Sequence, residues 1–252
     1  MRLGTVTYNL AKDWDIPTII KNCEATGFEA VELRTEHAHG VEPALTAEQR
    51  VAVKEQFRRS RVKLLSLGST CEFQSTDPAV VRQNIETCKK FVVLAHDIDA
   101  MGVKVRPNGF PRDADRPKTL RQIGEALRAC GEFSKGYGVE IWLEVHGSGT
   151  QDPPNIRTIM DVCNHPSVGV CWNSNPTDVV NGSVKQSFGL LSKWIRNCHI
   201  TELHSGYPYR EFFALLRGMD YQRYTLAEIP TSCEPERLMK YYRKLWLELQ
   251  SV

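Results

Sequence analysis

The sequence predicts an α/β protein with one domain, a (β/α)8 barrel over residues 1–252. Short β-like segments alternate with amphipathic helical segments, and eight such pairs in 252 residues are typical of this barrel. No low-complexity linker or abrupt change of composition divides the pairs, which indicates one domain. An open doubly wound sheet is the alternative. Its first strand is usually followed by a glycine-rich phosphate loop, and TYNLAKDW (residues 7–14) does not have that character.

Each predicted strand is a short apolar run bounded by polar or turn residues. In chain order, the strands are expected at residues 3–8, 28–34, 62–69, 102–108, 139–147, 168–175, 197–203 and 224–230. The helical segments have apolar residues at three- and four-residue spacing, as in Leu120, Ile123 and Leu127. They are expected at residues 16–27, 46–61, 78–99, 118–138, 155–164, 183–195, 209–219 and 235–250. Many follow Asp, Thr or Pro, and several end at Gly, as helix boundaries do.

Composition and charge argue against several classes of partner. The chain is 41% hydrophobic and 25% charged, as globular proteins are, and its net charge of +2 gives no electrostatic reason to expect nucleic acid. No apolar run is long enough to span a bilayer. The eight cysteines contain no C-x-x-C pair and fall mostly in helical or strand patterns, which favours buried, reduced thiols. The N-terminal segment leads directly into a strand, so we expect a cytoplasmic protein.

Polar side chains lie near the ends of six predicted strands, after the aliphatic stretch. They are Glu32 and Arg34, Arg106 and Asn108, Glu144 and His146, Asn173, His199 and Thr201, and Glu228. Barrel strands present their reactive side chains at their C-terminal ends. In EIWLEVHG, Glu144 and His146 share one face of the strand with Trp142. An ionised carboxylate in such apolar surroundings needs a partner, so we expect these side chains to converge on one site.

Four of these side chains, on four successive predicted strands, form a candidate cation site: Glu144, Asn173, His199 and Glu228. Carboxylate, amide and imidazole groups are ligands that Mn²⁺, Mg²⁺, Co²⁺ and Zn²⁺ all accept, and the set does not distinguish these ions. A bound cation would also offset the cost of burying the two carboxylates. A solvated position at the barrel rim is the alternative for each residue taken alone.

Other residues are candidates for substrate contacts. The planar guanidinium of Arg106 suits a substrate carboxylate or phosphate, and an interior salt bridge with Glu32 is the alternative. His146 is expected to face the substrate rather than to bind the cation. Phe110 and Tyr207 are candidate lids for the apolar face of a sugar.

Several segments of the chain resemble the xylose isomerase-like TIM-barrel superfamily of sugar isomerases and epimerases. LEVHG (residues 143–147) is similar to the glutamate motif of the fifth strand. CHITEL (residues 198–203) is similar to the seventh-strand motif, with Glu202 at its acidic position. PYREFFALLRGMDYQRYTLAEIP (residues 208–230) resembles the last helix and the eighth-strand glutamate. The resemblance covers nearly the whole chain and is most specific in its second half.

The resemblance implies a set of metal ligands. Glu144, His199 and Glu228 match three of the four ligands of that group. The fourth is normally an aspartate at the end of the sixth strand, and this chain has Asn173 there. An amide oxygen can bind a hard cation but brings no charge, so metal affinity should fall. Asp178 is the nearest acidic alternative in the sequence.

The function implied by the resemblance is a divalent-metal-dependent isomerase or epimerase of a sugar, a sugar phosphate or a hydroxy-keto acid. Glu144 and Glu228 would transfer the proton through an enediolate. The residues expected to bind substrate are Arg106, Asn108, His146 and Glu202. The partner would be a small carbohydrate-like molecule, and the sequence is compatible with a homo-oligomer.

Alternative functions use the same barrel mouth. One is a metal-dependent dehydratase or lyase. Another is a barrel that has lost its chemistry and binds a sugar-like ligand, because Asn173 weakens the metal site. Endonuclease IV-like activity needs three clustered zinc ions with more histidine and acidic ligands, and the sequence argues against it.

Overall fold

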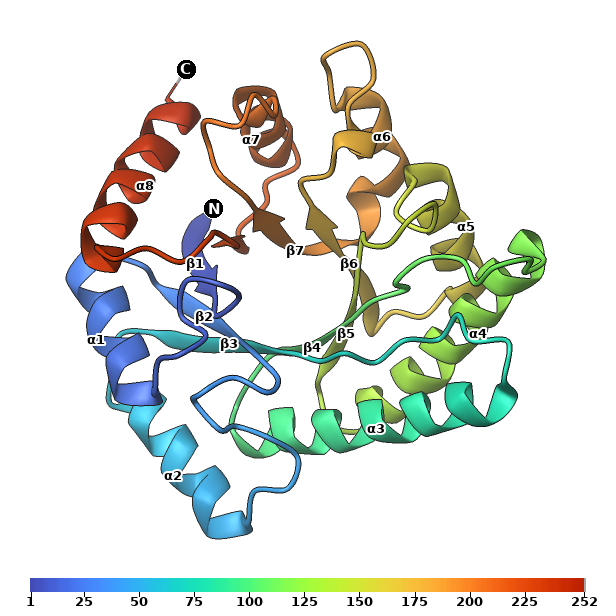
Figure 1. Ribbon diagram of the computed structural model, residues 1–252, viewed down its shortest axis with the longest axis horizontal. Coiled ribbons are helices and arrows are strands. Elements are labelled where there is room, and N and C mark those ends of the chain that lie inside the picture. Colours follow the sequence, from blue (N-terminus) through green and yellow to red (C-terminus); the bar gives the residue numbers. More distant parts are fainter. Residues whose placement is uncertain (252) are drawn as a thin grey trace.

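Eight parallel strands close into a barrel in which each strand pairs with the next in the sequence and β8 pairs with β1 (Figure 1). The computed structural model describes residues 1–251. The strands are β1 (Arg2–Val6), β2 (Ala30–Arg34), β3 (Lys63–Gly68), β4 (Gly102–Val105), β5 (Glu140–Glu144), β6 (Val168–Asn173), β7 (Ile195–Ile200) and β8 (Tyr224–Ala227). The predicted (β/α)8 barrel is thus confirmed.

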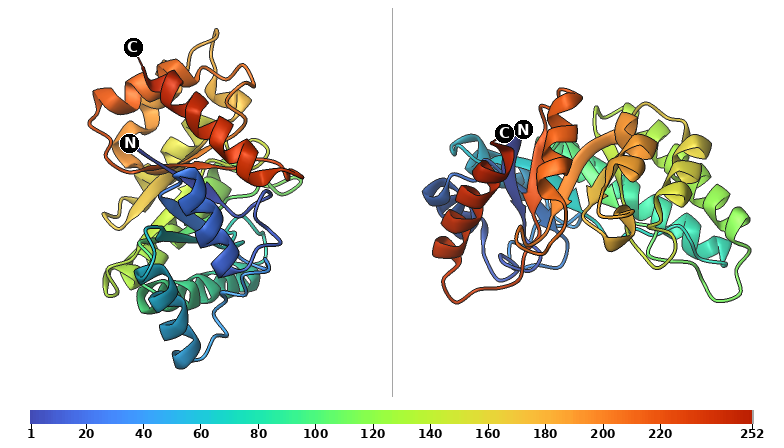
Figure 2. Two further views of the ribbon diagram at one scale, coloured as in Figure 1. Left: turned by 90° about the vertical axis from the view of Figure 1, so that its left-hand side faces the viewer. Right: turned by 90° about the horizontal axis from the view of Figure 1, so that it is seen from above.

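An α-helix follows each strand, and the helices wrap around the outside of the barrel (Figures 1 and 2). They are α1 (Ile16–Thr26), α2 (Ala47–Arg58), α3 (Pro78–Asp97), α4 (Arg116–Lys135), α5 (Pro153–Cys163), α6 (Lys185–Leu191), α7 (Tyr209–Gly218) and α8 (Pro235–Gln250). Within residues 1–251, no helix is both long and apolar enough to cross a membrane.

The helix boundaries follow the predicted capping signals. The Asp15 side chain accepts a hydrogen bond from the backbone N–H of Thr18 at the start of α1. Thr46 and Gln49 form a reciprocal capping box at the start of α2. At the end of α1, Gly27 adopts φ of 75°, a left-handed conformation that glycine accepts without steric cost.

The sixth helix is shorter than the sequence predicts. The expected segment was 183–195, but the α-helix ends at Leu191 and a 3-10 turn, η2 (Ser192–Trp194), follows it. The strand β7 then begins at Ile195, which is buried and in register with Val170 of β6. The tighter turn brings the chain into the sheet two residues earlier than expected.

Some predicted strand ends are loops in the structure. The strand β4 ends at Val105, so Arg106 and Asn108 lie in the loop after it. Asn108 has φ of 40°, which is incompatible with a strand. The sequence does carry a signal for this boundary, because Pro107, Asn108 and Gly109 favour a turn, and the expected strand was drawn past it.

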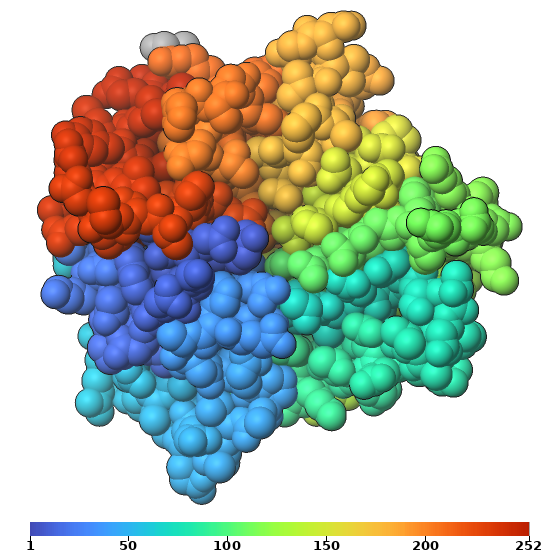
Figure 3. All heavy atoms as spheres, viewed as in Figure 1, coloured from blue at the N-terminus to red at the C-terminus, as the bar shows by residue number. Residues whose placement is uncertain are grey.

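A buried layer of side chains lies directly beneath the polar ends of the strands. Trp142, Cys171 and Leu226 belong to one buried cluster and precede Glu144, Asn173 and Glu228 by two residues each. Side chains two residues apart in a strand share a face, so the polar residues lie above this layer inside the barrel. Trp172, one residue before Asn173, points outward instead and stacks on Phe212. The space-filling view shows atoms filling the centre that looks open in the ribbon (Figure 3).

All eight cysteines are free, and seven of them are buried. Cys233 is the exposed one. The expectation of buried thiols rather than a disulfide framework is confirmed within the barrel.

Candidate active site

A cavity of about 580 Å³ opens where the C-terminal ends of the strands meet. Its walls include side chains from most of the barrel strands and from the loops that follow them. Arg34 of β2, Lys104 of β4 and Glu144 of β5 are among them. This is the end of a (β/α)8 barrel at which reactive groups gather.

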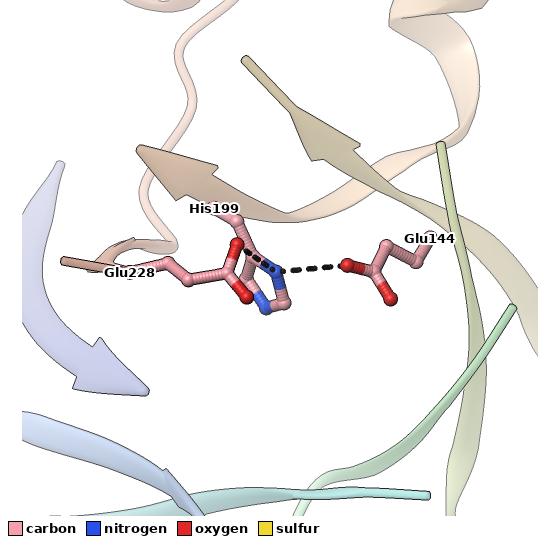
Figure 4. Close-up of side chains that lie close together, drawn as sticks. All are labelled: Glu144, His199 and Glu228. Carbon is pink, nitrogen blue, oxygen red and sulfur yellow. Dashed lines mark ion pairs between the residues drawn. The ribbon is translucent and has the colours of Figure 1, made fainter. Parts of the chain in front are cut away.

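Three predicted ligands converge at this cavity (Figure 4). Glu144, His199 and Glu228 each offer one ligand atom, and these three atoms lie within 4.8 Å of one another. Nδ1 of His199 lies 3.5 Å from Oε1 of Glu144 and 3.6 Å from Oε2 of Glu228. The imidazole therefore lies between two carboxylates that come from different strands.

Strand register explains this convergence. The Cα atom of His199 in β7 is in register with Leu226 of β8, and the backbone N–H of Glu228 donates to the carbonyl of Ile200. Glu228 therefore lies two residues beyond Leu226, the residue paired with His199, and its side chain is on the same face of the sheet as that of Leu226. Glu144 ends β5 and reaches the same space from the opposite wall (Figure 4).

The other ring nitrogen of His199 faces a second buried carboxylate. Nε2 lies 3.2 Å from Oε1 of Glu32, whose other oxygen accepts a hydrogen bond from Ser66 at 2.8 Å. Burial lowers the pKa of His199, but Cys171 and the neighbouring carboxylates outweigh burial, so this pKa lies well above its ordinary value. With Nε2 beside Glu32, Nδ1 faces Glu144 and Glu228 at the cavity.

Glu144 forms a second buried ion pair. Nζ of Lys104 lies 2.7 Å from Oε2 of Glu144, and both side chains are almost completely buried. Burial raises the pKa of Glu144, but Lys104 and His199 outweigh it and hold this pKa well below its usual range. Burial likewise lowers the pKa of Lys104, and Glu144 and Glu32 raise it above its ordinary value. Both partners are therefore charged at neutral pH.

The structure places the remaining predicted residues as follows. Asn173 is buried at the end of β6, in register with His199, and lines the cavity, as do His146 and Glu202. Nδ1 of His146 is buried and has no hydrogen-bond partner within residues 1–251. Asn108 is not among the described residues that line the cavity.

Arg106 lines the cavity but does not pair with Glu32, the interior partner considered from the sequence. Its Nη2 lies 2.9 Å from Oε1 of Glu72, and its Nε donates to the same oxygen. Glu72 lies in the loop after β3, the strand next to β4. Arg106 therefore pairs with a carboxylate of the neighbouring loop at the barrel rim and not with one inside the barrel.

Two predicted lids and one predicted substitute ligand lie elsewhere. Tyr207 donates to a buried oxygen of Asp178 at 3.1 Å and accepts from Trp172 at 3.0 Å. Neither Tyr207, Asp178 nor Phe110 is among the described residues that line the cavity. Asp178 instead ties the loop after β6 to the loop after β7.

The predicted set lacks some residues of the cavity wall. Lys104 lies in the middle of its strand rather than at the polar end, so a search for strand-end residues passes over it. Alternation gave a usable signal, because Lys104 stands between Val103 and Val105, both of which are buried on the outer face. Tyr8 follows β1 and lines the cavity, and its position in a loop gave no such signal.

The residues present fit a divalent cation. Neither ring nitrogen of His199 has a hydrogen bond within residues 1–251, although both are buried. Its Nδ1 and the carboxylate oxygens of Glu144 and Glu228 surround a common point. Two carboxylates and one imidazole suit Mn²⁺, Co²⁺ or Zn²⁺, and the oxygens also suit Mg²⁺. Asn173 would add a neutral oxygen.

Comparison with solved structures finds the same fold in several enzymes. The D-psicose 3-epimerase of Clostridium cellulolyticum H10, solved with D-tagatose, has a TM-score of 0.85 at 13% identity, with all of both chains covered. The IOLI protein, solved with a bound zinc atom, has a TM-score of 0.79 at 16% identity, covering 99% of this chain and 96% of that one. The probable 3-DHS dehydratase AsbF of Bacillus anthracis has a TM-score of 0.75 at 14% identity, covering 98% and 99%. At these identities the likeness is one of fold.

Comparison with curated protein sequences gives no match. Comparison with protein families matches residues 20–248 to the xylose isomerase-like TIM barrel. This match covers most of the chain, including β2 to β8 and the three converging ligands. The chain therefore belongs to the xylose isomerase-like TIM barrel family.

Proposed function

We propose that the protein is a divalent-metal-dependent isomerase or epimerase of a sugar or a related hydroxy-carbonyl compound. The convergence of Glu144, His199 and Glu228 at the floor of an open cavity is the observation that carries this proposal. The fold shared with a D-psicose 3-epimerase and with a zinc-binding protein supports it.

Glu144, His199 and Glu228 would hold the ion, with the amide oxygen of Asn173 as a fourth donor. When bound, a divalent ion supplies Lewis acidity toward a substrate carbonyl. Nε2 of His199 lies beside Glu32, which leaves Nδ1 facing the cavity as the nitrogen that would bind the ion once it has lost its proton.

Glu144 and Glu228 are the proposed acid–base pair. Glu144 is ionised and can accept the proton from the carbon next to the substrate carbonyl, which leaves an enediolate. Glu228 has a side chain that is 20% exposed and can exchange protons with solvent. Glu228, or a water next to it, would return the proton to the enediolate.

The cavity suits a small polar substrate. Its volume of about 580 Å³ is in the range of small-molecule sites. Arg34 and Arg106 can bind an anionic group of a sugar phosphate or hydroxy-keto acid. His146 and Glu202 can form hydrogen bonds with hydroxyl groups, and the free Nδ1 of His146 supports this role.

A substrate panel with Mn²⁺ tests the proposal. D-Psicose, D-tagatose and D-fructose, together with ketose phosphates and hydroxy-keto acids, would be incubated in D₂O and followed by NMR. We expect isomerisation or epimerisation of at least one compound, with deuterium entering at the reacting carbon. Binding of these compounds without turnover would instead favour a barrel that has lost its chemistry.

A metal-dependent dehydratase or lyase is the second candidate. Arg34 and Arg106 on the cavity wall favour it, because they would suit the carboxylate of a hydroxy-acid substrate. The same panel, extended with carboxylated polyols and inososes, distinguishes the two reactions. Loss of water gives an unsaturated or deoxy product that is lighter by one water molecule, whereas epimerisation in D₂O changes the mass only through the deuterium taken up.

A further inference from the structure

A lysine projects into the cavity from the middle of β4. Lys104 stands between Val103 and Val105, and its Cα is in register with that of Trp142 in β5. Both valines are buried in the core between strands and helices, so strand alternation directs Lys104 into the barrel. Its side chain is 7% exposed and lines the cavity. A lysine is rarely this buried unless its charge is paired.

Lys104 takes one of the two oxygens of Glu144. Its Nζ lies 2.7 Å from Oε2, whereas Oε1 faces Nδ1 of His199 at 3.5 Å. One oxygen of this carboxylate is thus held by a fixed cation, and the other is directed toward the proposed metal position. Among residues 1–251, Glu144 is the one hydrogen-bond partner of this ammonium.

The charges of the site place Lys104 in competition with a metal ion. An ammonium and a divalent ion on the two oxygens of one carboxylate repel each other, and water screens this repulsion poorly in a buried site. Lys104 also contributes a positive charge near Glu32 and Glu228. Asn173 supplies no compensating negative charge.

We infer that Lys104 is a built-in cation that sets the metal affinity of this site. It restricts Glu144 to one available oxygen, Oε1, and it weakens the binding of divalent ions. The inference rests on the metal site of the proposed function and adds a positioning role for Lys104. A lysine that served only to stabilise the barrel would weaken metal binding when removed, because the site around it would loosen.

Calorimetric titration of metal-stripped protein with Mn²⁺ at neutral pH tests this inference. Lys104→Met removes the charge and keeps the length of the chain. Lys104→Gln keeps a hydrogen-bond donor for Glu144 without the charge. We expect Mn²⁺ to bind at least about tenfold more tightly to each folded variant than to the wild type, because the repulsion is gone.

Lys63→Met is the matched control, because Lys63 pairs with Asp99 at the surface, outside the cavity. Its Mn²⁺ affinity should stay within about twofold of the wild type. Unchanged or weaker binding in the folded Lys104 variants would overturn the inference. So would a lack of Mn²⁺ binding in every protein tested.

A crystal structure of the wild type with Mn²⁺ gives a check that needs no variant. The expected structure has Lys104 on Oε2 and the ion on Oε1 of Glu144. An ion on both oxygens, with Lys104 displaced, would contradict the inference. Neither measurement uses a sugar, so failure of the proposed reaction in the substrate panel would be recognised separately.

Discussion

Glu144 and His199 each lie next to buried groups of opposite charge. Lys104 holds one oxygen of Glu144, and Glu32 faces one nitrogen of His199. A buried carboxylate without such partners would become protonated rather than remain charged. The pairs therefore explain how the apolar strand around Glu144 tolerates an ionised group, with one atom of each residue left for a ligand.

The two carboxylates should carry the turnover. Glu144→Gln removes the proposed proton acceptor and Glu228→Gln the group proposed to return the proton, and we expect each to lower turnover of the substrate found in the panel by about 10²–10⁴-fold. Circular dichroism would verify that each variant is folded. Glu132→Gln, at an exposed site next to His165, is the control and should keep wild-type turnover. Near wild-type rates in both cavity variants would end the acid–base assignment.

A substitution at Asn173 tests whether this residue is the fourth donor to the proposed ion. Asn173→Asp adds a charge next to His199, and we expect Mn²⁺ affinity, measured by calorimetry, to rise at least about tenfold. Asn164→Asp makes the same change at the exposed end of α5, outside the cavity, and as the control it should bind Mn²⁺ like the wild type. An unchanged affinity in Asn173→Asp would remove residue 173 from the ligand set.

At the residue scale, sequence reasoning was strongest where a side chain sits at the end of a regular strand. Glu144, His199 and Glu228 were predicted to converge, and the structure brings them together. Lys104 was not among the predicted site residues because it precedes the polar end of its predicted strand and lines the cavity through its long side chain. Asn108 was placed in the site because the predicted strand was extended through Pro107 and Asn108, although this stretch favours a turn after Val105.

At the scale of elements, the loop after β6 has its own buried anchor. The 3-10 turn η1 (Pro176–Asp178) carries Asp178, whose Oδ2 accepts from the backbone N–H of Asn175 and from Tyr207. Its Oδ1 is buried without a hydrogen bond in the described chain. Burial raises the pKa of Asp178 to about 7, against an ordinary value of 3.8. The protonation state of Asp178 therefore affects how the loop that carries Asn175 is anchored.

This anchor predicts a pH-dependent stability. The unfolded chain ionises Asp178 near pH 4 and the folded chain near pH 7, so folding stability falls as pH rises between these values. The contribution is about 1.4 kcal/mol per pH unit inside this window. Asp178→Asn should remove it, so that the stability of the variant rises relative to the wild type as pH increases from about 4 to about 7, the two pKa values.

Urea unfolding at several pH values measures this difference. Asp161→Asn is the control, because Asp161 is half exposed in a surface ion pair with Arg157. Parallel pH profiles for the wild type and Asp178→Asn would contradict the prediction.

Elements themselves were largely predictable, and their ends were not. Apolar spacing and capping residues fixed α1 and α2 to within a few residues. The end of α6 was predicted four residues too late, because Trp194 and Ile195 continue a helical pattern although they belong to η2 and β7. Pairing with β6 decides this boundary, and such pairing lies outside any local window of sequence.

At the scale of the molecule, the closed barrel brings together groups that are distant in the sequence. Glu32 and His199 meet across the interior, and β8 closes against β1. The periodic pattern predicted this closure because eight strand–helix units in a chain of this length are typical of a closed barrel. The identity of the partner at each site residue was not predictable, since it depends on the stagger of the strands around the barrel.

Metal removal should lower the stability of the whole barrel, because an ion at the strand ends would tie β5, β7 and β8 together. A free ion concentration of about one hundred times Kd stabilises a folded protein by about 2.7 kcal/mol. We expect a chelator to remove this stabilisation in urea unfolding of the wild type. In Glu228→Gln, which lacks a proposed ligand, the chelator should have a much smaller effect. Equal responses in the two proteins would argue against the site.

The central claim is that the ends of β5, β7 and β8 bind a single divalent ion. Anomalous diffraction from crystals soaked in Mn²⁺ measures this directly. The account predicts one strong anomalous peak at about 2.0–2.3 Å from an oxygen of Glu144, Nδ1 of His199 and an oxygen of Glu228. A fully soaked crystal with no peak there, or with Mn²⁺ bound only elsewhere, would contradict it.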